Sequence, residues 1–257
     1  MSSVIMLELK KILGKKGVLI TWVLTLLLAS ATIRTFSLTE TYADIFNKYY
    51  GLAPLMGIIM FMIFAGSYVV EYSSNMDELI KTTKNGRKGL VLAKSIANGI
   101  AASLMNVSIF LVMSLKAFNG FKFSGLNTLI KNLWYFGNSG SNITVMQMVV
   151  IMTITIIAGS FLFAQLGLFL SSISKKAIMP FFVGGIIMGL PYFSEFYGIS
   201  QFFPKKIVGF TPLWGMYSCQ ILRFKVPNYA FLVFGLITIV GSIVLYKLTL
   251  NAFSKER

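Results

Sequence analysis

The sequence has no histidine, a single cysteine and few acidic residues, with 8 Asp and Glu against 23 Lys and Arg in 257 residues. Without histidine, and with Cys219 alone, the chain cannot build an imidazole base, a Cys and His zinc site or an intrachain disulfide. It also lacks a phosphate-binding loop, because KNGRKG at 84–89 has neither the required spacing nor the hydroxyl residue. We therefore expect no catalytic residue, no metal site and no cofactor in the chain itself.

Apolar residues, in contrast, make up 56% of the sequence, and the mean hydropathy is +0.77. Six stretches approach the ~20 residues needed to cross a bilayer of roughly 30 Å. They lie at 17–36, 52–70, 95–117, 146–172, 177–197 and 229–248. The sequence thus predicts an all-α membrane protein with six transmembrane helices in a single domain, residues 1–257. The first stretch resembles a signal peptide, but no cleavage site follows it, so we expect it to be retained.

The basic residues predict the orientation. With the N-terminus inside, 14 of the 23 Lys and Arg fall in cytosolic segments, and most of the others lie in two longer outside loops. Both termini are therefore predicted to be cytosolic. Basic loops of a membrane protein face anionic lipid, so we do not expect a nucleic-acid partner.

The N-terminal segment before the first span has helical periodicity. Ile5, Leu9, Ile12 and Leu13 recur on one face, and four lysines lie largely off that face. Two interpretations remain open: an amphipathic helix lying on the inner leaflet, or a positive flank that only fixes orientation.

Ionisable residues are absent from the centres of the predicted spans. Glu71, Glu195, Arg34 and Lys116 fall at span ends, where we expect their charged groups to extend to the interface. A proton pump or secondary transporter normally keeps such groups near the midplane. This pattern gives no support to transport driven by the chain alone.

Uncharged polar residues within the spans have two interpretations. Asn98, Asn106 and Gln165 could line a polar path, but such residues also hold helices together, which is the interpretation we favour. Close packing of the fifth span is expected at Gly184, Gly185 and Gly189. We also expect Pro180 and Pro191 to bracket this span.

A polar segment, EYSSNMDELIKTTKNGRKGLVLAK at 71–94, separates the second and third spans. Its middle predicts a short helix in which Ser74 is the N-cap and Asp77 occupies the capping-box position. Asp77 and the adjacent Glu78 point about 100° apart, so they cannot form an acid and base pair. Met76, Leu79 and Ile80 would form a small apolar patch suited to docking in a groove of a partner.

This segment resembles the cytosolic loop of type 2 export permeases of the ATP-binding-cassette transporters, in which a coupling helix contacts a separate ATPase subunit. The resemblance implies partner contact at ten positions: Glu71, Tyr72, Met76, Asp77, Glu78, Leu79, Thr82, Thr83, Arg87 and Lys94. The sequence departs from the family pattern in lacking a proline where Lys84 or Asn85 stands.

The resemblance extends over the whole chain and implies an N-terminal elbow helix, six spans and short re-entrant helices at 198–228, before the last span. It further implies a bacterial plasma-membrane permease that has a second permease copy or a paralogue beside it. Its cargo would be a hydrophobic or amphipathic peptide, as in bacteriocin immunity or phenol-soluble modulin export, and ATP and Mg would bind to the partner ATPase.

Three alternatives stay open at this point. The chain could be a membrane sensor or immunity scaffold that binds peptide without moving it. It could be a lipid-modifying intramembrane enzyme whose acidic residues come from distant segments. The segment 71–94 could also be a solvated basic loop that serves only topology.

Overall fold

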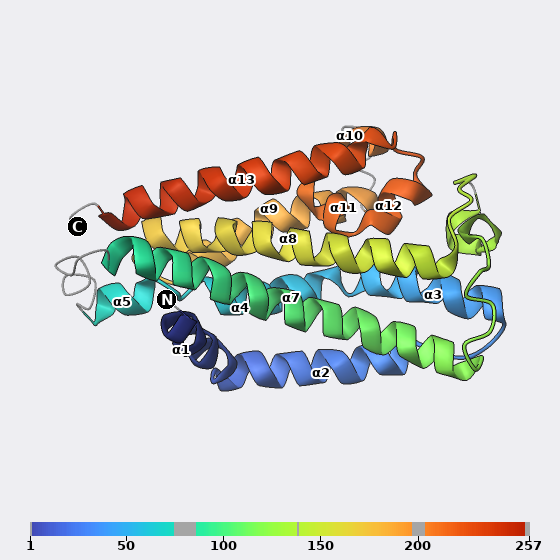
Figure 1. The fold of residues 1–257 in the computed structure, drawn as a ribbon, viewed down its shortest axis with the longest axis horizontal. Helices are drawn as coiled ribbons and strands as arrows, with labels where there is room; N and C mark the ends of the chain where they lie inside the picture. Colours follow the sequence, from blue (N-terminus) through green and yellow to red (C-terminus); the bar gives the residue numbers. More distant parts are fainter. Residues whose placement is uncertain (1, 75–85, 138, 197–203, 255–257) are drawn as a thin grey trace.

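A computed structural model describes residues 2–74, 86–137, 139–196 and 204–254. These residues form an elongated bundle of helices that run mostly along one direction (Figure 1). No β-strand occurs within these ranges, and the only β-bridge between the described residues is an isolated antiparallel one that joins Leu129 to Thr144. The all-α class predicted from the sequence is confirmed.

Twelve α-helices are present in the described part of the chain. Their bounds are α1 Ser2–Leu13, α2 Lys16–Thr32, α3 Leu38–Gly51, α4 Ala53–Phe64, α5 Val69–Ser73, α7 Gly86–Gly120, α8 Val145–Ile173, α9 Ile178–Phe196, α10 Lys205–Val208, α11 Pro212–Met216, α12 Ser218–Arg223 and α13 Tyr229–Ser254. Two 3-10 turns, Ile130–Asn132 and Trp134–Phe136, lie between α7 and α8. We call the end of the bundle with α5, the start of α7 and the end of α13 the base, and the opposite end, where α7 connects to α8, the far end.

Among the described residues, five helical segments are long and apolar enough to cross a membrane: Ala53–Ser73, which comprises α4 and α5, then α7, α8, Ile178–Glu195 and α13. The count becomes six if α1 and α2, which meet at a 69° bend, are taken as one broken span. Alone, α2 has 17 residues, because Ile33 leaves the helical conformation and Ser37 begins α3 as its N-cap. Five of the six predicted spans are thus matched directly, and the first is shorter than expected.

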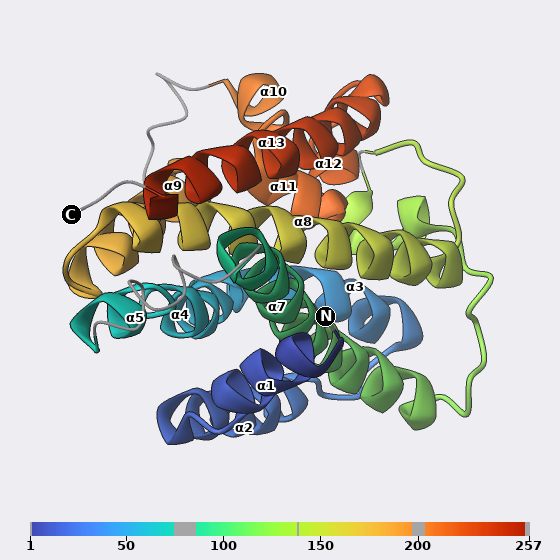
Figure 2. The ribbon, with the colours of Figure 1, turned by 60° about the vertical axis from the view of Figure 1, so that its left-hand side comes forward.

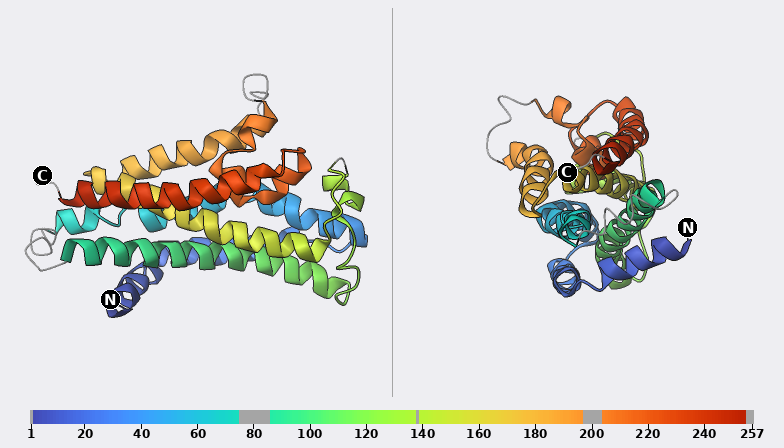
Figure 3. Two further views of the ribbon diagram at one scale, coloured as in Figure 1. Left: turned by 45° about the horizontal axis from the view of Figure 1, so that its top comes forward. Right: turned by 90° about the vertical axis from the view of Figure 1, so that its left-hand side faces the viewer.

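The long helices surround α8, which packs against α7, α13, α4 and α9 (Figures 2 and 3). Glycines bring these helices close together. A Cβ on Gly99 would lie 2.4 Å from the ring of Phe161, and one on Gly167 would lie 2.5 Å from Phe64. Large apolar side chains on the outer faces of α2, α9 and α13 remain exposed, as a lipid-facing surface requires.

The fifth span departs from the prediction in two ways. Pro191 lies inside α9 rather than at its end. Of the three glycines expected to pack closely, only Gly184 does, since a Cβ there would lie 2.0 Å from Phe61. A Cβ on Gly185 would meet no atom within 4 Å, and one on Gly189 would meet only Phe193 of the same helix.

The segment before α13 folds as three short helices, α10 to α12. The hydroxyl of Thr155 on α8 donates to the Met216 carbonyl at 3.2 Å and lies 3.0 Å from the Ser218 hydroxyl. Thr155 is about 15 Å along α8 from Val145, at 1.5 Å per residue. The junction between α11 and α12 therefore lies well below the far end of α8.

The uncharged polar residues within the bundle join helices. Gln165 accepts a hydrogen bond from Ser95 at 3.0 Å. Asn106 donates to Ser160 at 2.9 Å, and Asn98 accepts from Ser67 at 3.3 Å. All three are buried, so the geometry agrees with helix packing and not with a polar path.

Candidate functional site

The base of the bundle contains a cluster of buried charges from three helices. Glu8 comes from α1, Glu71 from α5 and Lys94 from α7, and Lys11 of α1 lies beside them. Glu71 and Lys94 are the two ends of the polar segment singled out in the sequence. The cluster therefore joins both flanks of residues 75–85 to the N-terminal helix.

Lys94 is the centre of this cluster. Its ammonium group donates to Glu8 Oε2 at 3.0 Å, to Glu71 Oε1 at 3.0 Å and to the Ser67 carbonyl at 2.9 Å. An ammonium has three donors, so each of them is used. The Lys94 side chain is 3% exposed, and burial at this level is tolerated only when the charge is fully paired.

Glu8 reaches Lys94 because of its place on α1. It lies on the same helix face as Ile5, Leu9 and Ile12, the stripe that the sequence predicted, and this stripe packs onto the bundle core. Glu8 Oε1 also accepts a hydrogen bond from Lys11 at 2.8 Å. The helix predicted for this segment is confirmed, and its apolar face carries one carboxylate.

The electrostatics of Glu8 and Lys11 reflect this pairing. Burial acts to raise the pKa of Glu8, but the nearby Lys94 and Lys11 outweigh it and hold this pKa below its ordinary value. The hydrogen bond to Glu8 raises the pKa of Lys11, and Glu71, 3.7 Å away, adds to the effect. Both residues are therefore stabilised in their charged forms.

Two predictions about charged span ends are wrong. Glu71 does not extend to the interface, since its side chain is buried within the cluster. The side chain of Glu195 is 8% exposed, and it pairs with Arg223 of α12 at 2.8 Å. In each case a cation from a distant segment lies close enough to compensate for desolvation. Arg34 and Lys116, in contrast, are exposed as expected.

Tyr72 connects α5 to the ends of α8 and α13 at the base. Its hydroxyl donates to the Ser172 carbonyl at the end of α8 at 2.9 Å. Its ring lies 6.0 Å from that of Phe253 near the end of α13. Through Glu71 and Tyr72, α5 is thus connected to α1, α7, α8 and α13.

A serine on α8 holds the break between α4 and α5. The Ser171 hydroxyl accepts a hydrogen bond from the Tyr68 amide and donates to the Ala65 carbonyl, both at 3.0 Å. These bonds satisfy backbone groups that the interrupted helix leaves free. They fix the position from which α5 leaves the bundle.

The ten residues predicted to contact a partner divide into three groups. Glu71 and Lys94 meet in the ion cluster, and Tyr72 lies beside it on α5. Arg87 is half-buried in the first turn of α7. The other six, Met76, Asp77, Glu78, Leu79, Thr82 and Thr83, lie outside the described residues, as does the predicted helix.

Ser74 does not begin a helix in the described part of the chain. It is the C-cap residue of α5, and its hydroxyl donates to the Val70 carbonyl at 2.9 Å. A serine hydroxyl commonly bonds to the carbonyl four residues earlier, and this satisfies a free acceptor at the helix end.

Sequence reasoning missed Glu8 and Lys11. The signal was a carboxylate in the centre of an otherwise apolar stripe, in a chain with only 8 acidic residues. A charge at such a position requires a partner of opposite sign. The sequence did not indicate which lysine supplies it.

The cluster contains carboxylates and ammonium groups that neutralise one another. Among the residues that the structure describes, no three His, Cys, Asp or Glu side chains are grouped to hold a metal ion. The cluster therefore connects the three helices to one another without offering a metal site.

Comparison of the sequence with protein-family models, with curated proteins and with solved structures gives no match.

Proposed function

We propose that the chain is the transmembrane permease subunit of an ATP-binding-cassette exporter in the bacterial plasma membrane. A separate cytosolic ATPase supplies the energy and contacts residues 71–94, and both termini are cytosolic. A second permease copy or a paralogue completes the translocation pathway. The cargo is a hydrophobic or amphipathic peptide, because the spans offer apolar surface and no midplane charge.

The position of the buried ion cluster carries this proposal. It binds both flanks of the polar segment to the N-terminal helix through Glu71, Lys94 and Glu8. A partner that displaces this segment would therefore move α1 and α7 with it, because separating these pairs would leave buried charges without a partner. A loop that served only topology would have no need of such a connection.

The bundle supports the finer architecture. The 69° bend between α1 and α2 suits an elbow helix on the inner leaflet, and Met6 and Leu7 on its outward face are exposed. Counting α2 as the first span gives six crossings. The α11–α12 junction, about 15 Å below the far end of α8, suits re-entrant helices.

The sidedness of the segment is tested by cysteine labelling. Because Cys219 is buried, Met76→Cys introduces the accessible thiol into an otherwise native chain. In intact cells, a membrane-impermeant maleimide should not label Met76→Cys until the membrane is opened. The outside control is Lys122→Cys, which should react without opening. Labelling of Met76→Cys in intact cells would refute the proposal.

The partner is tested by purification of the tagged full-length chain in mild detergent, with ATP hydrolysis as the readout. The triple variant Asp77→Ala, Glu78→Ala and Leu79→Ala should lose the associated ATPase activity. Glu40→Ala on α3, at the far end, should retain it and serves as the control. Retention of ATPase by the triple variant would remove the docking assignment, and peptide binding without any ATPase would favour the sensor or immunity scaffold.

A further inference from the structure

A second group of charges lies at the far end of the bundle, away from the proposed ATPase contact. Glu195 on α9 pairs with Arg223 on α12 at 2.8 Å and accepts a hydrogen bond from Gln220 at 3.3 Å. The guanidinium of Arg223 also lies 4.4 Å from the ring centre of Tyr135. This pair holds the end of α9 against the short helices that precede α13.

A cavity of about 820 Å³ opens beside this pair, between the ends of α2, α3, α9 and α12. Its charged lining consists of Arg34, Lys48, Arg223 and the single carboxylate Glu195. Basic side chains therefore outnumber acidic ones around it, which favours a negatively charged occupant.

One wall of the cavity is formed by Tyr50, whose side chain is buried. The hydroxyl of Tyr50 has almost no accessible surface and lies close to Glu195 and Trp214, so it is turned away from the open part of the cavity. Lys48 is paired with Asp44 at 2.6 Å, whereas Arg34 is exposed at the mouth. Arg34 is thus placed to bind oxygen atoms of a ligand.

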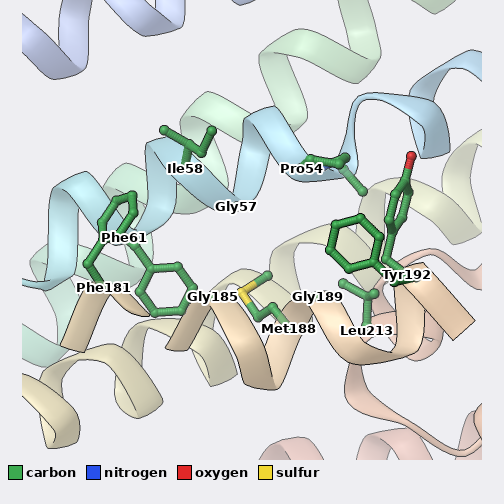
Figure 4. A pocket seen from close by; sticks show the side chains of 12 residues that line it. Pro54, Gly57, Ile58, Phe61, Phe181, Gly185, Met188, Gly189, Tyr192 and Leu213 are labelled. Carbon is green, nitrogen blue, oxygen red and sulfur yellow. The ribbon is translucent and has the colours of Figure 1, made fainter. Parts of the chain in front are cut away.

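A separate apolar cavity of about 190 Å³ lies along α4 and α9 (Figure 4). Tyr192 lines both cavities, and Phe61 and Phe181 lie at the other end of the apolar one. Gly57 and Gly185 form part of its wall, and a Cβ at either position would meet no atom within 4 Å. An apolar cavity of about 150 Å³ is large enough to bind benzene, so this one can hold part of a hydrocarbon chain.

We propose that the two cavities together bind a negatively charged phospholipid of the leaflet at the far end. Its phosphate lies in the basic cavity near Arg34, and part of one acyl chain lies in the apolar cavity. Basic pockets between transmembrane helices on the cytosolic side bind acidic lipid headgroups, and we propose the same attraction at the far end. The exposed side chains of Leu28 and Phe193 beside the cavities favour a lipid over a water-soluble ligand.

Native mass spectrometry of the full-length protein in a neutral detergent tests this site. The probes are phosphatidylglycerol and phosphatidylcholine with identical acyl chains, with inorganic phosphate as a competitor. We expect one phosphatidylglycerol to bind in preference to phosphatidylcholine. Arg34→Gln should weaken phosphatidylglycerol binding about fivefold, since one basic residue near a lipid surface contributes about 1 kcal/mol and 1.4 kcal/mol is tenfold. The exposed Lys122→Gln is the charge-matched control and should have no effect.

The apolar cavity is tested with Gly185→Leu, which fills it and should weaken phosphatidylglycerol binding without removing charge. The control is Gly235→Leu, because a Cβ on Gly235 of α13 also meets no atom within 4 Å. A melting curve checks that each variant is folded, and if Gly185→Leu is not, the Arg34 comparison decides. Equal binding of the two lipids by the wild type would overturn the proposal. So would wild-type affinity in Arg34→Gln, or displacement of the lipid by phosphate alone.

Discussion

Replacing Lys94 by Met should destabilise the protein more than most single substitutions. Lys94 provides the three hydrogen bonds that neutralise Glu8 and Glu71 and satisfy the Ser67 carbonyl. Methionine has a similar length but no charge, so the substitution leaves two carboxylates buried near each other. Lys11 remains within 2.8 Å of Glu8 and 3.7 Å of Glu71, and it compensates in part.

The expected magnitude follows from the burial of these groups. Removing one partner of a buried ion pair costs about 3–5 kcal/mol, and the remaining Lys11 places this case near 3 kcal/mol. For a chain of this size, each kcal/mol lowers the melting temperature by about 2–4 °C. Lys94→Met should therefore melt about 6–12 °C below the wild type.

The chain itself offers a convenient assay. Cys219 is the single cysteine and is fully buried, so a fluorogenic maleimide reacts with it only as the protein unfolds. Heating the purified protein with this dye gives the melting temperature. Lys88→Met, in the first turn of α7, is the matched control and should change this temperature little.

A triple variant separates stability from function. Replacing Glu8 and Glu71 by Leu together with Lys94→Met removes the charges as a group, which should leave stability within about 1 kcal/mol of the wild type or raise it. If the cluster transmits movement to a partner ATPase, as we propose, this variant should fold but lose cargo-dependent ATP hydrolysis. A melting temperature for Lys94→Met within about 2 °C of the wild type would refute the assignment of Lys94 as a buried paired charge.

Two further predictions concern pH and packing. The lowered pKa of Glu8 contributes stability that is present above its ordinary value of 4.5 and is lost as the pH falls, so the melting difference between wild type and Glu8→Gln should shrink in acid. The raised pKa of Lys11 contributes stability that is present below pH 10.5 and is lost as the pH rises, so the difference in melting temperature between wild type and Lys11→Met should shrink in alkali. Tryptophan fluorescence measures the melting temperature of both variants. Differences in melting temperature that do not depend on pH would contradict the pairing. Gly184→Ala should destabilise by about 1–3 kcal/mol because its Cβ meets the Phe61 ring, whereas Gly185→Ala should be neutral or stabilising. Equal melting temperatures for the two alanine variants would contradict the close approach of α4 and α9.

The long helices could be predicted accurately from the sequence because, in a bilayer without water, a run of about 20 apolar residues satisfies its backbone hydrogen bonds within the segment only as a helix. The predicted spans at 146–172 and 229–248 correspond to Val145–Ile173 and Tyr229–Ser254. Helix faces were also predictable, because residues spaced four and seven positions apart, as Ile5, Leu9 and Ile12 are, lie on the same side of an α-helix. The helix Leu38–Gly51 was missed because it carries too many polar residues to be recognised as a span.

The candidate site could be predicted only in part. Glu71 and Lys94 were predicted as site residues because they lie at the two ends of a polar segment. Their contact with each other, and with Glu8, depends on how three helices are aligned. The sequence alone suggested that Glu71 would extend to the interface, as a carboxylate does when it has no partner.

What the sequence by itself determined is local: which segments are helical, how long they are and which face of each is apolar. Tertiary structure decided the rest, because Glu8 and Lys94 are 86 residues apart and Glu71 and Lys94 are 23 apart. Whether a charge lies in water or is buried against an opposite charge depends on the surroundings that distant helices create. No local pattern contains that information.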